Sequence, residues 1–269
     1  MAKITFAEAL ELNLNPSELC ISDGVAENRI PLNCIKVDTL DILSLDSLHS
    51  EIHARKPERI VGIGGFTAVN AAKVLSVKRL KKGGLKQAVF ENPFPLIPVT
   101  LVPTARAFCT EVTPLTIFFD SSVPVYNVLF IDPETVKVPL NLYSRNPERE
   151  RGGYTPTSWE EGKLQDYISF CSRAYTRLLD LEFILSLSIA ALTGVNLEVA
   201  YSCIRQLSEK PLDEIALQDT FSRIARQVER KVDHYVEHTW SFYRNFLVKW
   251  GVRNRAQLYK KYVSILSYE

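Results

Sequence analysis

Short apolar runs rich in β-branched residues alternate with helix-like or turn segments over Leu19–Asp132. Leucines and isoleucines recur at helical spacing over Ile42–Ile52, and the stretch Ala68–Val77 is rich in Ala, Val and Leu. This alternation favours a parallel sheet whose strands are connected by helices. Strands are predicted at Leu19–Ser22, Cys34–Val37, Arg59–Ile63, Leu96–Val102, Leu115–Phe119 and Tyr126–Ile131.

The apolar positions change to a helical period from Trp159 onward. One long helix, opened by Pro211, is predicted there. Its apolar stripe consists of Leu217, Phe221, Ile224, Val228, Val232, Tyr235, Phe242 and Phe246. The preceding segment Pro139–Pro156 is rich in prolines and charges, which is typical of a linker. We therefore expect an α/β domain over residues 1–140 and an all-helical domain over residues 141–269.

The charge balance narrows the possible partners. The chain carries 32 Lys and Arg against 31 Asp and Glu, so it has no overall field that attracts nucleic acid or an anionic membrane. Interleaved aromatic and basic residues over Trp240–Lys261 are explained more simply by a packed amphipathic helix than by a nucleic-acid surface. The longest apolar stretch, Phe183–Leu192, is interrupted by serines and is too short to span a bilayer. We expect neither a nucleic-acid nor a membrane partner.

The cysteines bear on the compartment in which the chain works. There are five, without Cys-x-x-Cys spacing, and an odd number of scattered cysteines argues against a disulfide framework. Cys109 is interpreted as a buried inert thiol rather than a reactive one. Residues 1–14 carry two glutamates and lack the apolar core of a signal peptide. The expected location is the reducing cytoplasm.

A glycine-rich turn follows the third predicted strand. Gly64 and Gly65 end the strand and precede the helix-like stretch that begins near Phe66. Residues without Cβ allow the backbone to approach a pyrophosphate, and the N–H groups at the start of the helix stabilise its charge. A tight strand-to-helix turn without a ligand is an equal alternative, because glycine-rich turns are common.

Two further motifs follow the glycine turn. The first contains Pro-Thr and Thr-Glu-Val-Thr segments, and the second is Ile-Asp-Pro-Glu. The three motifs consist of Gly64, Gly65, Thr67 and Lys73, then Pro103, Thr104, Thr110, Glu111, Val112 and Thr113, then Ile131, Asp132, Pro133 and Glu134. In content and order they resemble the iron-containing alcohol dehydrogenases, relatives of glycerol dehydrogenase and dehydroquinate synthase. The resemblance implies a Rossmann-like domain with a parallel sheet, followed by a small all-α domain, with NAD or NADP bound at the strand ends.

The resemblance also implies roles for individual residues. Gly64, Gly65 and Thr67 would hold the pyrophosphate, while Thr104 and Thr110 would line the nicotinamide side of the site. Asp38, at the end of the second predicted strand, is placed to accept hydrogen bonds from the adenosine ribose, which favours NAD over NADP. A helix or turn cap is an equal alternative for Asp38.

The sequence departs from the motifs within the same region. Phe66 replaces a third glycine and Asn70 replaces an aspartate, and both are counted among the candidate cofactor-binding residues. The small residues of the second motif are replaced over Arg106–Cys109. Arg106 could contact a phosphate through its guanidinium, although a surface arginine is the commoner explanation.

The resemblance further implies a divalent iron or zinc ion held by one Asp and three His in the helical domain. The chain has four histidines. His49 and His53 lie in the first predicted helix and are interpreted as residues of its exposed face. His234 and His238, four residues apart in the helical half, are the candidate catalytic acids or metal ligands. A structural or solvent-facing pair is the favoured alternative, so the sequence leaves the metal unassigned.

The leading functional hypothesis is an NAD-dependent oxidoreductase acting on an alcohol or carbonyl group of a small molecule or peptide, as in the tailoring of a natural product. A non-catalytic descendant of the same fold, binding a nucleotide or a partner protein, is the first alternative. A cyclase similar to dehydroquinate synthase, acting on a sugar phosphate, is the second. The Glu-Val-Thr run at Glu111–Thr113 fits the dehydrogenases better than the cyclases. The sequence leaves a homodimer or a partner protein open.

Overall fold

The computed structural model describes residues 2–7, 14–24, 33–78, 84–85, 95–105, 107, 109–140, 165–166, 168–169, 171, 180–197, 199–201, 204 and 215–266. The chain separates into two compact units. Unit 1 comprises Met1–Ser121 and Asn127–Tyr175, and unit 2 comprises Ser122–Tyr126 and Thr176–Glu269. The boundary predicted between residues 140 and 141 adjoins residues 141–164, which lie outside the described residues together with most of the predicted linker.

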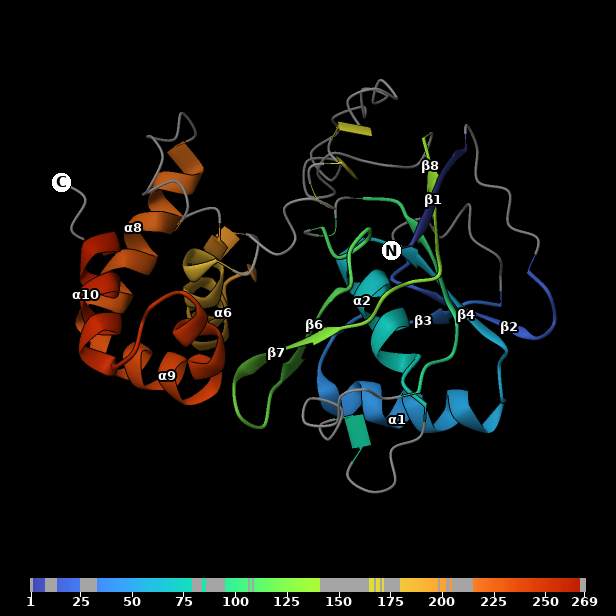
Figure 1. Cartoon of the computed structure of the whole chain (residues 1–269), viewed down its shortest axis with the longest axis horizontal. Coiled ribbons are helices and arrows are strands. Elements are labelled where there is room, and N and C mark those ends of the chain that lie inside the picture. The colour runs from blue at the N-terminus through green and yellow to red at the C-terminus, as the bar shows by residue number, and fades with distance from the viewer. Residues whose placement is uncertain are drawn as a thin grey trace. The chain divides into compact units, whose positions relative to one another are not determined.

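A six-stranded sheet, in which all neighbouring strands are parallel, forms the centre of unit 1 (Figure 1). In spatial order its strands are β1 (Lys3–Ala7), β8 (Thr135–Pro139), β5 (Val99–Pro103), β4 (Arg59–Gly64), β2 (Glu18–Ser22) and β3 (Ile35–Lys36). The central strands are largely apolar because helices or loops cover both faces of such a sheet. The predicted parallel sheet and the α/β fold class are confirmed.

Two predicted strands do not belong to this sheet. β6 (Leu115–Asp120) and β7 (Val125–Phe130) pair with each other in a separate two-stranded sheet. Only four residues connect them, whereas a parallel crossover needs about a dozen or more. The edge of the large sheet is instead completed by β1 and β8, which the apolar pattern did not predict. Exposed and half-buried residues alternate along β1, so it lacks the continuous apolar run of a central strand.

Two helices belong to unit 1, α1 (Ile42–Ala54) and α2 (Phe66–Leu75), as predicted from their apolar spacing. α2 packs closely on β4 at Gly62, where an added Cβ would lie 2.5 Å from the Cβ of Ala72. The imidazole Nε2 atoms of His49 and His53 lie 2.6 Å and 3.1 Å from the carbonyl oxygens of Val77 and Leu75. The expectation that these histidines are exposed is therefore wrong, because both are half-buried between α1 and the end of α2.

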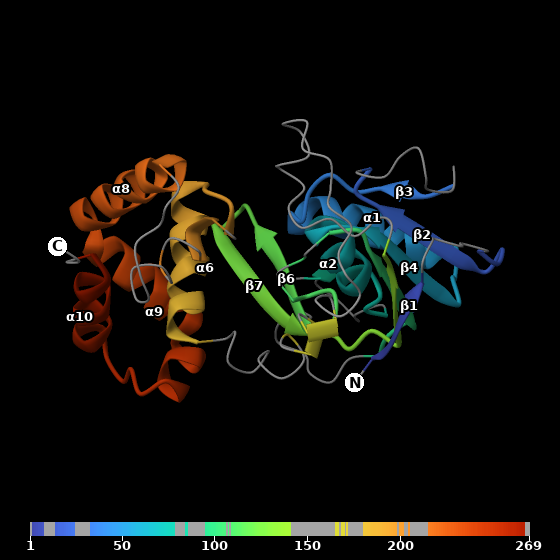
Figure 2. The same cartoon turned by 90° about the horizontal axis from the view of Figure 1, so that it is seen from above.

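Unit 2 contains the helices α6 (Leu181–Thr193), α8 (Ile215–Arg230), α9 (Val232–Lys249) and α10 (Arg255–Leu266), which Figure 2 shows packed together. The single long helix predicted here is wrong, because the chain breaks at Lys231, whose φ is −137° and ψ is 30°. The break changes the direction of the side chains, and Phe242 of the predicted stripe is 43% exposed. The buried residues of α9 are Tyr235, Val236, Thr239, Trp240, Tyr243 and Leu247. Pro211, predicted to open the helix, lies outside the described residues.

Two disulfides are present, and the expectation of unpaired cysteines is wrong. Cys20 is bonded to Cys34 and Cys109 to Cys171, with Cα–Cα distances of 4.5 Å and 5.4 Å. The pairs are far apart in the sequence and are brought together by the fold. The first joins β2 to the residue that precedes its neighbour β3. Disulfides are typical of oxidising compartments, so the cytoplasmic location stays a prediction that the cysteines no longer support.

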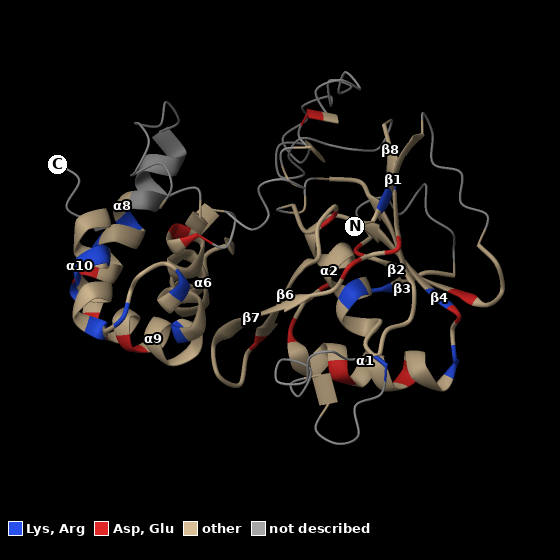
Figure 3. Ribbon diagram, viewed as in Figure 1, with Lys and Arg blue, Asp and Glu red and all other residues tan. Residues whose placement is uncertain are grey.

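The helical surface of unit 2 carries charges of both signs. Figure 3 shows acidic and basic residues interspersed along α9. Arg255 of α10 forms a salt bridge of 2.6 Å with Glu237, and its guanidinium lies 5.6 Å from the centre of the Trp240 ring. No helix within the described ranges is both long and apolar enough to cross a membrane.

Candidate functional site

The glycine turn lies at the carboxyl end of β4, directly before α2. Gly64 has φ +143°, a conformation that favours glycine, and its carbonyl accepts a hydrogen bond of 2.9 Å from the N–H of Thr104. Because Thr104 directly follows β5, the carboxyl ends of two central strands meet here. Ligands of open parallel sheets bind at this edge, which makes the turn the leading candidate site.

The amino-terminal end of α2 offers hydrogen-bond donors. The first bond within the helix runs from the N–H of Val69 to the carbonyl of Gly65 at 3.1 Å, so the N–H groups of Phe66, Thr67 and Ala68 have no partner in the helix. No acidic residue lies in the first turn of α2 to offset the positive end of its dipole. An anion is therefore stabilised at this end of the helix.

A buried hydroxyl beside the turn has no hydrogen-bond partner among the described residues. Thr104 is only 4% exposed, and within the described residues its Oγ1 has no hydrogen-bond partner. Leaving such a group unsatisfied costs about 1–3 kcal/mol, so an unpaired hydroxyl beside a helix N-terminus indicates a place where a ligand or water atom is expected. The predicted cofactor contact of Thr104 stays a prediction, which this position motivates.

The acidic residue nearest the turn is Asp23, which the sequence analysis missed. Its Oδ2 accepts a hydrogen bond of 2.7 Å from the N–H of Gly65. Asp38 instead lies after β3, with its side chain 76% exposed and 3.9 Å from the ammonium of Lys36. Since β2 and not β3 pairs with β4, the acid beside the turn is the one that follows β2. The signal was available, because Asp23 comes directly after the first predicted strand. The ribose contact of Asp38 stays a prediction.

Asn70 and Thr110 are fully buried and contact each other. The amide of Asn70 donates to the Thr110 hydroxyl at 3.0 Å, and its Oδ1 accepts from the N–H of Ile117 at 2.8 Å. The Thr110 hydroxyl also donates to the carbonyl of Ala107. These bonds hold the loop that follows Thr104 against α2. A cofactor contact for either side chain stays a prediction.

Lys73 anchors the same loop from inside α2. Its ammonium is fully buried and donates to three carbonyls, those of Thr110, of Thr113 at 2.6 Å and of Leu115 at 2.9 Å. Burial lowers the pKa of Lys73 to about 7, while the carboxylates of Glu111 and Asp132 act in the opposite direction. The lysine matched to the first motif thus connects that motif to the second through hydrogen bonds, and its ammonium faces the loop rather than a ligand.

The remaining departures from the motifs are Phe66 and the segment Arg106–Cys109. Arg106 and Phe108 lie outside the described residues, as does any phosphate contact of Arg106. Cys109 has φ +61° and is joined to Cys171, so it is neither a free inert thiol nor a free reactive one. Phe66, in the position of the third glycine, and Thr67 are both half-buried.

The candidate catalytic histidines lie on α9 in unit 2. The Nε2 of His238 donates to the carbonyl of Pro124 at 2.7 Å, so its Nδ1 is the acceptor for the Ser188 hydroxyl at 3.1 Å. Ser188 continues into a buried hydroxyl network with Thr239, at 2.8 Å. His234 is exposed. Both ring nitrogens of His238 are thus engaged by protein atoms, and the catalytic roles of the two histidines stay predictions.

A family-type metal centre does not fit the residues that the structure describes. Among them, no three His, Cys, Asp or Glu side chains come together in a way that could hold a metal ion. The histidines of α1 contact backbone carbonyls, and His238 has no nitrogen lone pair free for a metal. The chemistry proposed for this chain therefore has no step that runs through a metal.

The burial of His238 predicts an acid-sensitive unit 2. Burial lowers the pKa of His238, and the nearby His234 acts in the same direction. An unfolded histidine has a pKa of about 6.5, so the unfolded chain binds the proton first as the pH falls. The stability that His238 provides is therefore complete above a pH of about 6.5 and is lost as the pH falls through the lower folded pKa. We expect a loss of about 1 kcal/mol, the worth of one hydrogen bond, between about pH 7 and pH 5.

Urea unfolding at pH 7, 6 and 5, followed by tryptophan fluorescence, measures this loss. His238→Gln removes the titration while keeping an amide donor and acceptor, so its stability should change less over the same pH range. His234→Gln, at the exposed position, should keep most of the acid sensitivity, because burial is the larger cause of the lowered pKa of His238 and His234 the smaller one. An unchanged pH dependence in His238→Gln would show that other groups cause the acid sensitivity.

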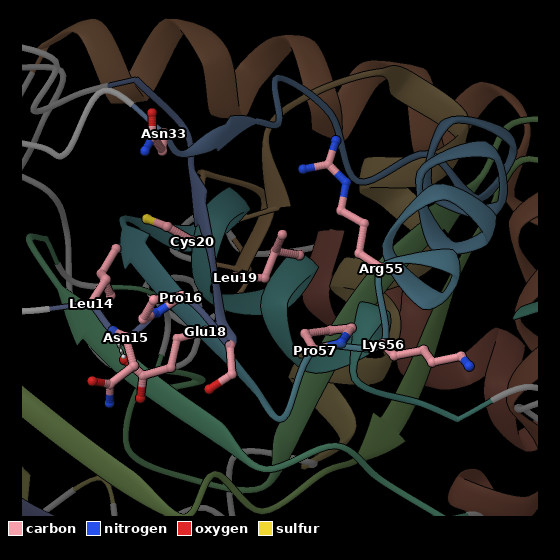
Figure 4. A pocket seen from close by; sticks show the side chains of 11 residues that line it. Leu14, Asn15, Pro16, Glu18, Leu19, Cys20, Asn33, Arg55, Lys56 and Pro57 are labelled. Atoms are coloured by element: carbon pink, nitrogen blue, oxygen red, sulfur yellow. Dashed lines mark hydrogen bonds between the residues drawn. The ribbon is translucent and has the colours of Figure 1, made fainter.

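A cavity in unit 1 lies at the opposite, amino-terminal ends of β2 and β4. It has a volume of about 600 Å³ and is lined by Leu14–Cys20, Asn33 and Arg55–Pro57 (Figure 4). The Arg55 guanidinium forms a salt bridge with Glu51, and Glu18 is 3.5 Å from Arg59. These charged groups are thus already paired within the protein. Because parallel sheets bind ligands at the carboxyl ends of their strands, the glycine turn remains the better candidate.

The comparisons with known proteins identify the fold. No protein-family model matches the sequence, and no curated protein matches it by sequence. An NADH-dependent butanol dehydrogenase from Thermotoga maritima superposes with a TM-score of 0.57 at 11% identity, over 99% of this chain and 96% of that chain. An iron-containing alcohol dehydrogenase from Thermotoga maritima gives a TM-score of 0.54 at 12% identity, over 93% of this chain and 84% of that chain. The chain has the fold of the iron-containing alcohol dehydrogenases.

A probable glycerol dehydrogenase from Sinorhizobium meliloti is a further solved structure with this fold. It gives a TM-score of 0.55 at 10% identity, over 93% of this chain and 90% of that chain. The resemblance read from the three short motifs is thus confirmed at the level of the fold. At these identities the likeness shows the fold alone, so activity is argued from the site.

Proposed function

We propose that the chain binds a nicotinamide dinucleotide, NAD in preference to NADP, and transfers hydride between it and an alcohol or carbonyl group. The observation that carries the proposal is the set of N–H groups at the start of α2 beside the buried hydroxyl of Thr104, which has no partner within the described residues. A dinucleotide has a pyrophosphate for the helix terminus and sugar hydroxyls for neighbouring polar groups. Similar solved structures include an NADH-dependent butanol dehydrogenase, which supports this choice of ligand.

Each residue of the turn has a physical task in this proposal. The N–H groups of Phe66 and Thr67 donate to phosphate oxygens, and the α2 dipole stabilises their charge. The Thr104 hydroxyl donates to, or accepts from, a polar atom of the ligand. The loop anchored by Lys73 keeps Thr104 and Thr110 in place.

The nicotinamide ring, when bound, supplies the hydride acceptor or donor. The protein then has to position the substrate carbon, exclude water and take up the proton of the alcohol. His234 and His238 are the proposed proton acceptors, since they are the histidines of the helical unit. His238 would have to give up the hydrogen bond from the Ser188 hydroxyl before its Nδ1 could accept a proton. His238→Ala combined with His234→Ala tests this role, and unchanged turnover of the double variant would remove both residues from the mechanism. A small molecule or a peptide is the proposed substrate class.

Calorimetric titration with NADH and NADPH tests the cofactor proposal directly. We expect saturable binding of NADH and weaker binding of NADPH. Thr104→Val keeps the shape of the side chain and removes the hydroxyl, so it should weaken NADH binding about fivefold to tenfold, the worth of one hydrogen bond of about 1–1.5 kcal/mol.

Thr5→Val is the matched control for this titration, because Thr5 donates to the carbonyl of Val136 at 3.4 Å on the edge strand β1. It should leave NADH affinity unchanged. Absence of NADH binding to the wild type, or equal binding by Thr104→Val, contradicts the proposed site.

A non-catalytic nucleotide-binding role is the second candidate function. The observation that favours it is the engagement of both His238 nitrogens together with the lack of a metal-binding set within the described ranges. The two candidates differ in turnover. NADH oxidation or NAD reduction across a panel of aldehydes and alcohols supports the enzyme, whereas stoichiometric binding without turnover supports the binding protein.

A further inference from the structure

The positive end of α2 is already in contact with an anion of the chain itself. Gly65 has no side chain to cap the helix, and no acid lies in the first turn of α2. The carboxylate of Asp23, from the end of β2, accepts the Gly65 N–H at 2.7 Å. A hydrogen bond to an ionised acceptor at a helix N-terminus is among the stronger ones in proteins.

The glycines of the turn fit this carboxylate closely. A Cβ added to Gly64 would lie 2.6 Å from both the carboxyl carbon and Oδ2 of Asp23. Gly64 is thus required by the approach of Asp23 as well as by its φ of +143°. The space that a glycine turn leaves for a ligand phosphate is here partly taken by a carboxylate of the protein.

We propose that Asp23 is a built-in competitor for the phosphate-binding position at the start of α2 and sets which ligands the turn accepts. A phosphate can use the N–H groups of Phe66 and Thr67 only with the carboxylate close beside it, and the two negative charges repel each other. The site therefore discriminates against ligands with concentrated negative charge. It accepts ligands in which the negative charge is spread over several groups, and a dinucleotide belongs to this class.

This inference rests on the proposed function only for the identity of the ligand. The competition between Asp23 and a phosphate follows from the geometry of the turn. The Thr104 hydroxyl, which has no partner within the described residues, is a second, independent indication of a ligand at the turn. Thr104 is tied to Gly64 through its N–H at 2.9 Å, so the hydroxyl and the Asp23 carboxylate flank the same two glycines.

Asp23→Asn tests the proposal, because it removes the charge and keeps an oxygen that can accept the Gly65 N–H. Calorimetric titrations use inorganic pyrophosphate, ADP, adenosine and NADH as probes. We expect the variant to bind pyrophosphate and ADP about tenfold more tightly than the wild type, or better. Adenosine, which has no phosphate, should bind both proteins equally. Glu51→Gln, at an exposed position of α1 where the carboxylate is paired with Arg55, is the control and should leave all four affinities unchanged.

Each other outcome has a defined meaning. Equal or weaker binding of pyrophosphate and ADP by Asp23→Asn overturns the proposal, and weaker adenosine binding shows that the carboxylate instead holds the sugar hydroxyls. If no protein binds any nucleotide, the proposed function fails, while the pyrophosphate titration still decides the role of Asp23. Asp23→Ser provides a second uncharged variant should Asp23→Asn fail to fold, as judged by circular dichroism.

Discussion

Replacing Lys73 with Met should destabilise unit 1 by about 3–5 kcal/mol, because three buried carbonyls lose their donor and each unsatisfied group costs about 1–3 kcal/mol. Methionine has nearly the shape of lysine without its ammonium, so the change removes the hydrogen-bond donors and the charge but little volume. The carbonyls of Thr110, Thr113 and Leu115 would lose their donor, and Glu111 and Asp132 would lose a buried cation. Buried polar groups left without partners account for most of the expected loss.

Urea unfolding followed by circular dichroism measures the effect of Lys73→Met. Lys36→Met is the control, because Lys36 is 56% exposed and its ion pair with Asp38 spans 3.9 Å, so the change should stay within about 0.5 kcal/mol. The loop that begins at Thr104 should also become the first site of proteolysis in Lys73→Met. Equal stability of the two variants would mean that the three carbonyls are readily satisfied by water.

Lys73 also marks the limit of what local patterns predict. Its place in a motif drew attention to it, yet a lysine in the helix after a glycine turn is equally consistent with a ligand contact. Only the fold shows that its side chain runs inward to a loop some forty residues later. The strand–turn–helix unit around Gly64 was predictable, because a continuous apolar run, two glycines and an Ala-rich stretch all indicate it.

The features that were missed depend on pairing between distant segments. Asp23 became a site residue because β2 is the neighbour of β4, and no local pattern gives strand order. The same holds for the bond between Cys20 and Cys34, which requires β2 and β3 to lie side by side. No Gly or Pro lies at the break at Lys231, so the sequence pattern predicted one continuous helix across it.

The close packing of α2 on β4 makes Gly62→Ala the second large prediction, with an expected loss of about 1–3 kcal/mol. An added Cβ would lie 2.5 Å from the Cβ of Ala72 and 3.2 Å from the carbonyl oxygen of Ala68. Neither contact can be relieved by rotating a side chain, because one atom is a Cβ and the other is backbone. The helix must therefore move away from the strand, which loosens the element that presents the Phe66 and Thr67 N–H groups.

A double-mutant cycle separates this clash from other effects of the substitution. Ala72→Gly alone should cost about 1 kcal/mol through helix propensity, but it removes the atom that the new methyl group would meet. The double variant should therefore lose less stability than the two single variants lose together, since the two residues share one contact. Gly65→Ala is the control within the same turn, because its Cβ would meet nothing nearer than 3.5 Å and should cost far less. Strict additivity of Gly62→Ala and Ala72→Gly would show that α2 can move away from β4 at little cost. The contact between Gly62 and Ala72 would then not fix the position of the α2 N-terminus, on which both the nucleotide site and the role of Asp23 depend.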